Sequence, residues 1–245
     1  MGVANSKLIA TYCVLDTRFR DLALILKHLN KLSFPQASKR IDSYGFSTMA
    51  LAYLQWLGVL PKLTLIGKQN KGEEAQKIIK FKKVRYVDKK KTDSQFWEEN
   101  YMTDVGFESD IESIRSIFKP REGTEHLKVG DFLVGFFDFY TRVFKSEEHC
   151  ISTSHQEGSL ICKSAYKKKL LACFPNENDV YKVELERKFE DYWFFIVDPF
   201  DWTMNYGKRV TKSTPLKDQY LHMMQTNLDS LVNTGLFSGM SNQNL

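Results

Sequence analysis

A mainly helical α+β fold is predicted by three features of the sequence. Apolar residues in the first sixty positions recur with helical spacing, and the aromatic run at 132–144 is typical of a core helix. Strand-like runs are few and short. The chain has 245 residues, 42% of them hydrophobic and 27% charged, which gives a globular protein enough apolar material for a core. Wholly disordered, collagen-like, coiled-coil and disulfide-scaffold classes are excluded.

The first long helix is predicted around residues 22–29, where leucine and isoleucine follow the i, i+3, i+4, i+7 pattern of an amphipathic helix. Phe34-Pro35 ends it, because the residue before a proline disfavours helical backbone. A second helix is predicted at 43–57. The apolar residues at 63–66 are expected to form a short strand.

Residues 68–125 are predicted to be an insertion, because they contain a strongly basic run with few apolar residues. From Lys77 to Lys91 there are eight Lys or Arg residues and one acid. We expect a solvated, partly mobile loop there rather than a nucleic-acid contact, because charge runs are usually just solvated. A short helix is predicted at 111–118.

Regular structure is expected to resume at residue 127. The predicted elements are an apolar helix at 132–144, short strands at 151–152 and 160–163, a basic helix at 165–173, a strand at 192–197 and a final helix at 215–232. The tail at 236–245 is expected to be frayed. We therefore expect one domain over residues 1–245.

Charge, cysteine content and hydropathy bear on the compartment and the partners. The net charge of +5 permits a polyanionic partner without requiring one. No uncharged apolar run reaches the roughly 18 to 20 residues that span a bilayer, and no secretory leader is evident. Four cysteines, none of them in a CxxC pair, are too few to stabilise a chain of this size through disulfides. We expect a soluble intracellular protein, cytoplasmic or nuclear, with no membrane contact.

Two lysines on the first long helix are the first candidate for chemistry. Lys27 and Lys31 lie four residues apart and therefore on one helix face. Two ammonium groups in register can hold phosphate oxygens. The same spacing also describes an ordinary solvent-facing side of a helix, and spacing alone favours that simpler interpretation.

The second and third candidates are a helix start and a strand end. Asp42 or Ser43 is suited to cap the second helix, which would place Tyr44 in its first turn, where a ring can stack on a base. Asp198 and Asp201 follow the apolar strand, where acids can point into a cleft. The alternatives are a core tyrosine and a solvated turn.

The order and identity of these segments together resemble one family. The segments are NSKLIATYCVLDTRFRDLALILKHLNK, DSYGFSTMALAYLQWLGVLPKL, DFLVGFFDFYTRVF and FFIVDPFDWTMNYGKRV. They resemble the noncanonical poly(A) polymerases and terminal uridylyltransferases of the DNA-polymerase-β-like nucleotidyltransferases, over about residues 3–67 and 127–210. The resemblance implies the helical central domain of the nucleotidyltransferase fold, including the poly(A)-polymerase-associated region.

The resemblance implies a nucleotide pocket, position by position. Asn5 and Ser6 match the Asn-Ser/Thr pair that touches the nucleotide sugar. Lys27 and Lys31 match two lysines that hold the triphosphate.

In the family, four more matched positions contact the base, the sugar or a phosphate. Ser43 and Tyr44 match a pair in which Ser contacts phosphate or sugar and Tyr stacks on the base. Asp198 and Asp201 match the acids of the family's DPF[DE] loop, which read the base edge directly or through water.

Two positions near the end of this region bear on the base and on the RNA. Lys208 or Arg209 lies where the family has a basic residue near the RNA or the nucleotide. Met204 stands where uridylyltransferases usually have His, although the following Asn205 is kept. Methionine offers no strong hydrogen bond, so UTP and ATP both remain open as substrates.

The family's chemistry is two-metal phosphoryl transfer, in which Mg²⁺ ions are held by three aspartates. Those aspartates match nothing in this chain, so the catalytic sheet domain is expected to be absent and no catalytic or metal-ligating residue is assigned. We expect the chain to be inactive alone. It would be the C-terminal, nucleotide-binding part of an enzyme that adds UMP or AMP to RNA 3′ ends, with a separate polypeptide as one source of the catalytic domain. The alternative is a noncatalytic RNA- or NTP-binding scaffold of an RNA-processing complex.

Overall fold

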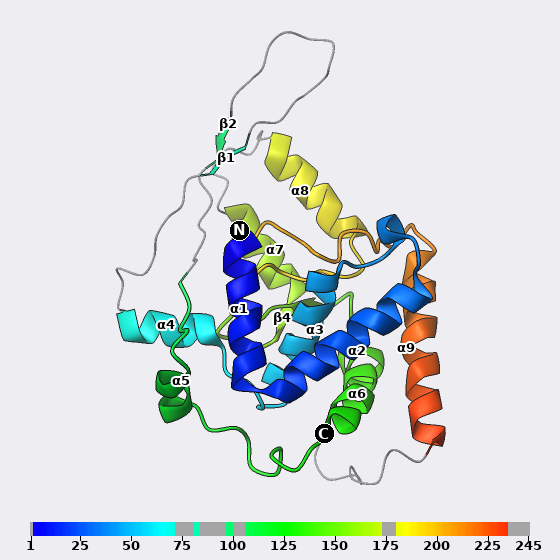
Figure 1. The fold of residues 1–245 in the computed structure, drawn as a ribbon. Helices are drawn as coiled ribbons and strands as arrows, with labels where there is room; N and C mark the ends of the chain where they lie inside the picture. The colour runs from blue at the N-terminus through cyan, green and yellow to red at the C-terminus, as the bar shows by residue number, and fades with distance from the viewer. Residues whose placement is uncertain (1, 72–80, 84–96, 100–105, 173–179, 235–245) are drawn as a thin grey trace.

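The computed structural model describes residues 2–71, 81–83, 97–99, 106–172 and 180–234, and it is predominantly helical (Figure 1). The predicted mainly helical fold with a few short strands is thus confirmed. The helices are α1 Gly2–Leu15, α2 Thr17–Ser33, α3 Ser43–Trp56, α4 Leu63–Lys71, α5 Ile111–Ile117, α6 Val129–Asp138, α7 Lys163–Ala172, α8 Val180–Asp191 and α9 Leu216–Asn233. The strands form two antiparallel pairs, β1 Phe81–Lys83 with β2 Trp97–Glu99 and β3 His149–Ile151 with β4 Leu160–Cys162.

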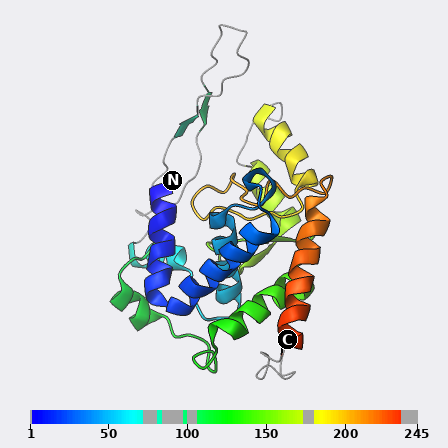
Figure 2. The same ribbon diagram turned by 45° about the vertical axis from the view of Figure 1, so that its right-hand side comes forward.

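The main core lies around α3. Ten of the eleven residues from Gly45 to Gln55 are buried. Helix α3 is therefore surrounded by other elements on all sides rather than amphipathic. Helices α2, α6 and α9 pack about it, and the two views agree in placing α1 and α9 on opposite sides (Figures 1 and 2). Phenylalanines of α6, among them Phe132 and Phe136, fill the space between these helices.

The starts of α2 and α3 have a clear physical basis. Asp16 precedes α2 and its side chain accepts from the backbone N–H of Arg18, while Asp42 precedes α3 and accepts from Gly45. Both are side-chain caps for helix N–H groups that lack an internal partner. Of the two predicted capping residues, the structure selects Asp42.

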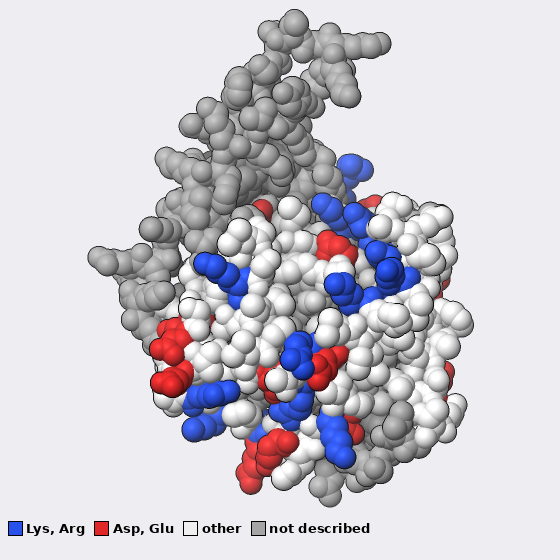
Figure 3. Space-filling model, viewed as in Figure 1, with Lys and Arg blue, Asp and Glu red and all other residues white. Residues whose placement is uncertain are grey.

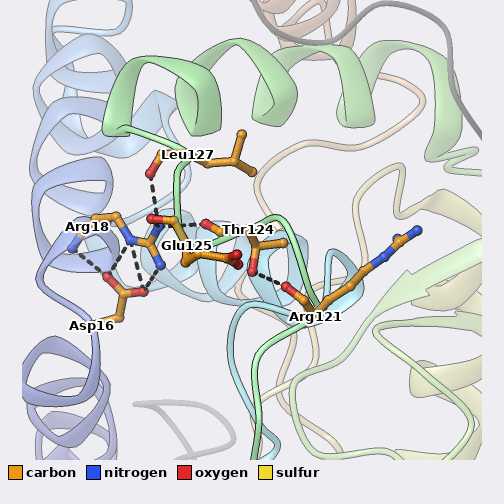
Figure 4. Close-up of polar contacts among 6 residues, drawn as sticks. All are labelled: Asp16, Arg18, Arg121, Thr124, Glu125 and Leu127. Carbon is orange, nitrogen blue, oxygen red and sulfur yellow. Dashed lines mark hydrogen bonds and ion pairs between the residues drawn. The ribbon is translucent and has the colours of Figure 1, made fainter.

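Arg18 fastens a long connection to the corner between α1 and α2 (Figure 4). Its Nη1 donates to the carbonyl oxygens of Thr124 at 2.8 Å and Leu127 at 2.9 Å. Its Nη2 lies 2.7 Å from Asp16 Oδ2, and the guanidinium lies over the Phe132 ring at 5.0 Å. One side chain thus fixes where the connection re-enters the fold before α6.

The expected strand at 63–66 is wrong, because these residues begin helix α4. In the first turn of α4, the backbone N–H groups of Leu65 and Ile66 donate to the carbonyl oxygen of Lys62. Leu63 and Ile66 are buried, and this spacing of three suits a helix as well as a short strand. A four-residue apolar run cannot distinguish the two by periodicity.

The expected strand at 192–197 is also wrong as a regular strand. The segment makes only isolated bridges, from Tyr192 to Thr211, from Ile196 to Ile151 and from Val197 to Asn205. Its residues are buried as predicted, but neighbouring segments are too irregular to form a ladder with it. Side-chain amides supply part of the missing pairing, as described below.

The insertion at 68–125 is described only in parts. Phe81–Lys83 in the basic run forms β1, so these three residues are not the loop that was expected; the rest of the run at 77–91 lies outside the described residues. The predicted helix at 111–118 is present as α5. The frayed tail expected at 236–245 lies outside the described residues, and α8 had not been predicted.

Candidate functional site

The site is organised around the carboxylate of Asp198, which is only 1% exposed. The chain enters through Val197 and returns through Asn205, which form an antiparallel bridge. Between them, Asp198 Oδ1 accepts from the backbone N–H of Phe200 at 2.7 Å and of Asp201 at 2.8 Å. These bonds fold the Asp-Pro-Phe-Asp segment into a tight turn, as aspartate side chains commonly do.

The other oxygen of Asp198 joins this turn to helix α1. Oδ2 accepts from Asn5 Nδ2 at 2.9 Å and from the Tyr206 hydroxyl at 2.7 Å. Asn5 Nδ2 also donates to the Tyr206 oxygen at 3.0 Å. The Asp198 carboxylate therefore receives four donors, which compensates the cost of burying its charge.

Two tyrosine rings adjoin this carboxylate. Tyr44, in the first turn of α3, and Tyr206 meet edge to face with centroids 4.7 Å apart at 62°. Burial, together with the nearby Asp198 charge, raises the pKa of both hydroxyls well above the usual value. Both groups therefore stay protonated at neutral pH.

A glycine allows this close approach of α3. A Cβ atom at Gly45 would lie 2.7 Å from Ile41 Cγ2 and 3.1 Å from Tyr206 Cβ. Any larger residue would push the first turn of α3 away from Tyr206. The Ser-Tyr-Gly sequence thus places a ring next to the Asp198 turn.

Asp201 and Met204 lie on the outer part of the turn and are half-buried. Asp201 Oδ1 accepts from the backbone N–H of Thr203 at 3.0 Å and from its hydroxyl at 2.6 Å. Met204 donates its N–H to the Asp201 carbonyl at 2.9 Å, and its side chain adds an apolar surface.

Asn205 is buried and holds the turn from inside. Its Oδ1 accepts from the N–H groups of Ile196 at 2.8 Å and Gly207 at 2.7 Å. Its Nδ2 donates to the carbonyl of Phe194 at 2.9 Å. The side chain replaces strand pairing for the 192–197 segment.

The cationic candidates lie on the surface. Lys27, Lys31 and Lys208 are exposed, and Arg209 donates from Nη1 to the carbonyls of Ala37 at 2.7 Å and Arg40 at 3.1 Å. In Figure 3, Lys and Arg side chains gather on the upper right of the face, over the end of α2 that Figure 1 draws there.

The structure brings some predicted residues together and leaves others apart. Asn5 and Asp198 are hydrogen-bonded, and Tyr44 joins them through Tyr206. Ser6 and Ser43 are exposed side chains of α1 and α3, and among the described residues no contact ties Lys27 or Lys31 to the Asp198 turn. Sequence reasoning missed Tyr206, because no spacing rule distinguishes a tyrosine that follows Asn205 from an ordinary surface residue.

The described residues form neither a metal-ligand cluster nor a membrane-spanning helix. Within the described residues, no group of three or more His, Cys, Asp or Glu side chains is placed to hold a metal ion. The acids of the Asp198 turn are engaged by donors instead. No described helix combines the length and hydropathy needed to cross a membrane.

Comparison with known proteins now bears on the predicted family. The model of a family described as Cid1 family poly A polymerase matches residues 128–203. The terminal uridylyltransferase cid1 of Schizosaccharomyces pombe is 25% identical over 219 residues, which cover 87% of this chain and 44% of the relative. The predicted family resemblance is confirmed. The chain spans less than half the length of this curated relative.

Solved Cid1-type structures share the fold. A mutant of the Cid1 poly(U) polymerase bound to MgATP has a TM-score of 0.61 at 22% identity, over 96% of this chain and 59% of that one. Cid1 with the UTP analogue UMPNPP has a TM-score of 0.60 at 21% identity, over 94% and 58%. A cytoplasmic RNA terminal U-transferase has 0.60 at 21%, over 93% and 57%.

Proposed function

We propose that this chain is the nucleotide-binding part of an RNA 3′-terminal nucleotidyltransferase that adds UMP or AMP. The observation that carries the proposal is the joining of Asn5, Tyr44 and Asp198 through one tyrosine. These residues come from three distant segments, and each matches a nucleotide-contacting position of the family. In this proposal, Asn5 and Ser6 contact the sugar and Tyr44 stacks on the base.

The remaining roles are assigned on the same basis. Lys27 and Lys31 neutralise the triphosphate and Ser43 contacts phosphate or sugar. Asp201 and Met204 face the base edge, and Asp198 acts through the hydrogen bonds that shape the turn.

The proposal also covers the residues near the RNA and the source of the Mg²⁺ ligands. Lys208 and Arg209 lie near the RNA 3′ end, where cations attract phosphates. When bound, Mg²⁺ would stabilise the attacking and leaving oxygens of phosphoryl transfer. The described residues do not supply a ligand set for it, so the catalytic acids would come from elsewhere in the enzyme.

Nucleotide binding and tailing test different parts of this proposal. Calorimetric titration of the 245-residue chain with UTP and with ATP should show saturable binding that Tyr44→Ala weakens. Adding the catalytic fragment of a Cid1-type enzyme in trans should restore Mg²⁺-dependent tailing of an RNA oligonucleotide. A folded, associated pair that neither binds nucleotide nor tails RNA would contradict the proposal.

A noncatalytic RNA-binding scaffold is the second candidate. The basic run from Lys77 to Lys91 favours it. This function predicts metal-independent RNA binding with a steep salt dependence. Neutralising Lys82, Lys83 and Lys89–Lys91 should reduce both affinity and salt slope, and an unchanged affinity would reject the scaffold function.

A further inference from the structure

The hydroxyl of Tyr206 completes a closed ring of hydrogen bonds. Asn5 Nδ2 donates to Tyr206 at 3.0 Å, Tyr206 donates to Asp198 Oδ2 at 2.7 Å, and Asn5 Nδ2 donates to the same Oδ2 at 2.9 Å. The ring spans helix α1 and the segment after the Asp198 turn. It contains no water-mediated step and no backbone group.

Charge and valence fix the direction of every bond in this ring. A carboxylate only accepts, so the Asn5 atom facing Asp198 must be the nitrogen. This nitrogen lies within hydrogen-bonding distance of both Asp198 Oδ2 and the Tyr206 oxygen. Asn5 Oδ1 consequently points elsewhere, and it is buried without a hydrogen-bond partner.

The Asn5 amide nitrogen is engaged by Asp198 and Tyr206, and its oxygen is the buried atom without a hydrogen-bond partner. A buried acceptor is costly to leave unpaired. A hydrogen-bond donor on a bound molecule would relieve that cost, whereas another acceptor would not.

The ring of Tyr206 adds a second constraint. It lies edge to face against Tyr44, and the glycine at position 45 brings the two tyrosines together. Tyr206 therefore contacts the residue assigned to the base with its ring, and the residue assigned to the sugar with its hydroxyl. No other described side chain links all three of Asn5, Tyr44 and Asp198.

We propose that Tyr206 is a positioning residue of the nucleotide site: its hydroxyl fixes the Asn5 amide and the Asp198 carboxylate, and its ring fixes Tyr44. The inference rests on the proposed nucleotide-binding function. Tyr206 acts through these neighbours.

The spectroscopic test does not depend on nucleotide. In ¹⁵N–¹H spectra of the full chain, the Asn5 side-chain amide, assigned from its loss in Asn5→Ala, should show a hydrogen that exchanges slowly because it is held by Asp198 and Tyr206. Tyr206→Phe should shift this signal and speed its exchange severalfold. An Asn5 amide signal that is unchanged in Tyr206→Phe would overturn the positioning role.

The affinity test adds Tyr220→Phe as a matched control, because Tyr220 is a buried tyrosine with its own hydroxyl network away from Asp198. Tyr206→Phe should weaken UTP or ATP binding about tenfold, the effect of losing one hydrogen bond to a charged group, and Tyr206→Leu more. Tyr220→Phe should leave affinity unchanged. Equal losses in both Phe variants would overturn the proposal.

A double variant shows whether Tyr206 acts through Asn5. Asn5→Ala with Tyr206→Phe should lose less affinity than the sum of the two single losses, because the part of the Tyr206 effect that passes through Asn5 is already gone while the part through Asp198 remains. Fully additive losses would overturn the action through Asn5. If the unaltered chain binds neither nucleotide, the proposed function fails. The Asn5 amide spectra still decide whether Tyr206 positions Asn5.

Discussion

Two tyrosine–asparagine networks in this molecule use similar residues for different ends. Tyr220 accepts from the N–H of Ile41 at 2.7 Å and donates to Asn30 Oδ1 at 3.0 Å, and Asn30 Nδ2 donates to the Ile41 carbonyl at 2.8 Å. This network is neutral and its tyrosine is fully buried. The Tyr206 network contains a carboxylate, leaves Asn5 Oδ1 unsatisfied, and has a half-buried tyrosine.

The two networks differ in how completely their side-chain polar atoms are paired. In the Tyr220 network each side-chain polar atom has a partner, and the ring stacks on Phe34 at 4.1 Å. In the Tyr206 network one acceptor remains without a partner at a matched nucleotide-contacting position. The Tyr220 network is thus closed within the core, whereas the Tyr206 network keeps one acceptor that a bound molecule could pair under the proposed function.

Asp198→Ala should have the largest effect on stability. The change strands four donors, those of Phe200, Asp201, Asn5 and Tyr206. We expect the free energy of unfolding to fall by roughly 3–5 kcal/mol, because several buried donors lose their hydrogen bonds to a charged acceptor, measured by urea denaturation. Asp198→Asn, which keeps one acceptor oxygen, should lose less; equal stability of the unaltered chain and Asp198→Ala would remove the structural role.

Gly207→Ala tests how tightly the segment after Tyr206 is held. A Cβ there would lie 2.6 Å from both the carbonyl oxygen and the Cβ of Phe194, so we expect a loss of about 1–3 kcal/mol from overpacking. Gly130→Ala is the matched control, since its Cβ meets nothing within 4 Å. The melting temperatures should separate the two variants, and a harmless Gly207→Ala would show that this segment yields.

Tyr44→Ala should act on ligand affinity. A ring that stacks on a base contributes about 1–3 kcal/mol, so nucleotide affinity in calorimetry should fall by a corresponding factor. Ser47→Ala, one turn along the same helix, is the control. A drop in thermal stability without any change in affinity would make Tyr44 a purely structural residue.

Tyr220→Phe should destabilise the chain without touching affinity. It leaves the Ile41 N–H and Asn30 Oδ1 without their partner, which costs about 1–2 kcal/mol, again read by urea denaturation. An affinity loss in this variant would erase the distinction between the two networks.

Alkaline pH should give the smallest and most gradual effect. Burial raises the pKa of Tyr206 and of Tyr220 above the usual value of 10.0. The unfolded chain then loses these protons first, so stability is full below about pH 10 and falls as pH rises further. Each Tyr→Phe variant should flatten this fall in denaturation curves between pH 9 and 11, and an unchanged slope would contradict the shifts.

Sequence alone could predict the regions where local signals agree. The apolar spacing of α2, its end before Pro35 and the capping aspartate of α3 are local signals, and the structure follows them. The positions Asn5 and Asp198 were matched through the family resemblance; they are hydrogen-bonded to each other, and their contact with a nucleotide stays a prediction.

The failures arise where tertiary contacts decide. Residues 63–66 form a helix because Leu63 and Ile66 pack inward together, and 192–197 lacks a ladder because its neighbours are irregular. Tyr206 could not be found, since its importance depends on bonds to residues 8 and 201 positions away.

The Asn205 side chain has a consequence for solubility. Five neighbouring buried residues, Trp193 to Val197, have the composition of segments that pair with copies of themselves when their backbone is free. By bonding Phe194 and Ile196, Asn205 pairs backbone groups of this segment inside the fold. One amide thus helps to keep an apolar stretch buried, where it cannot associate with another copy.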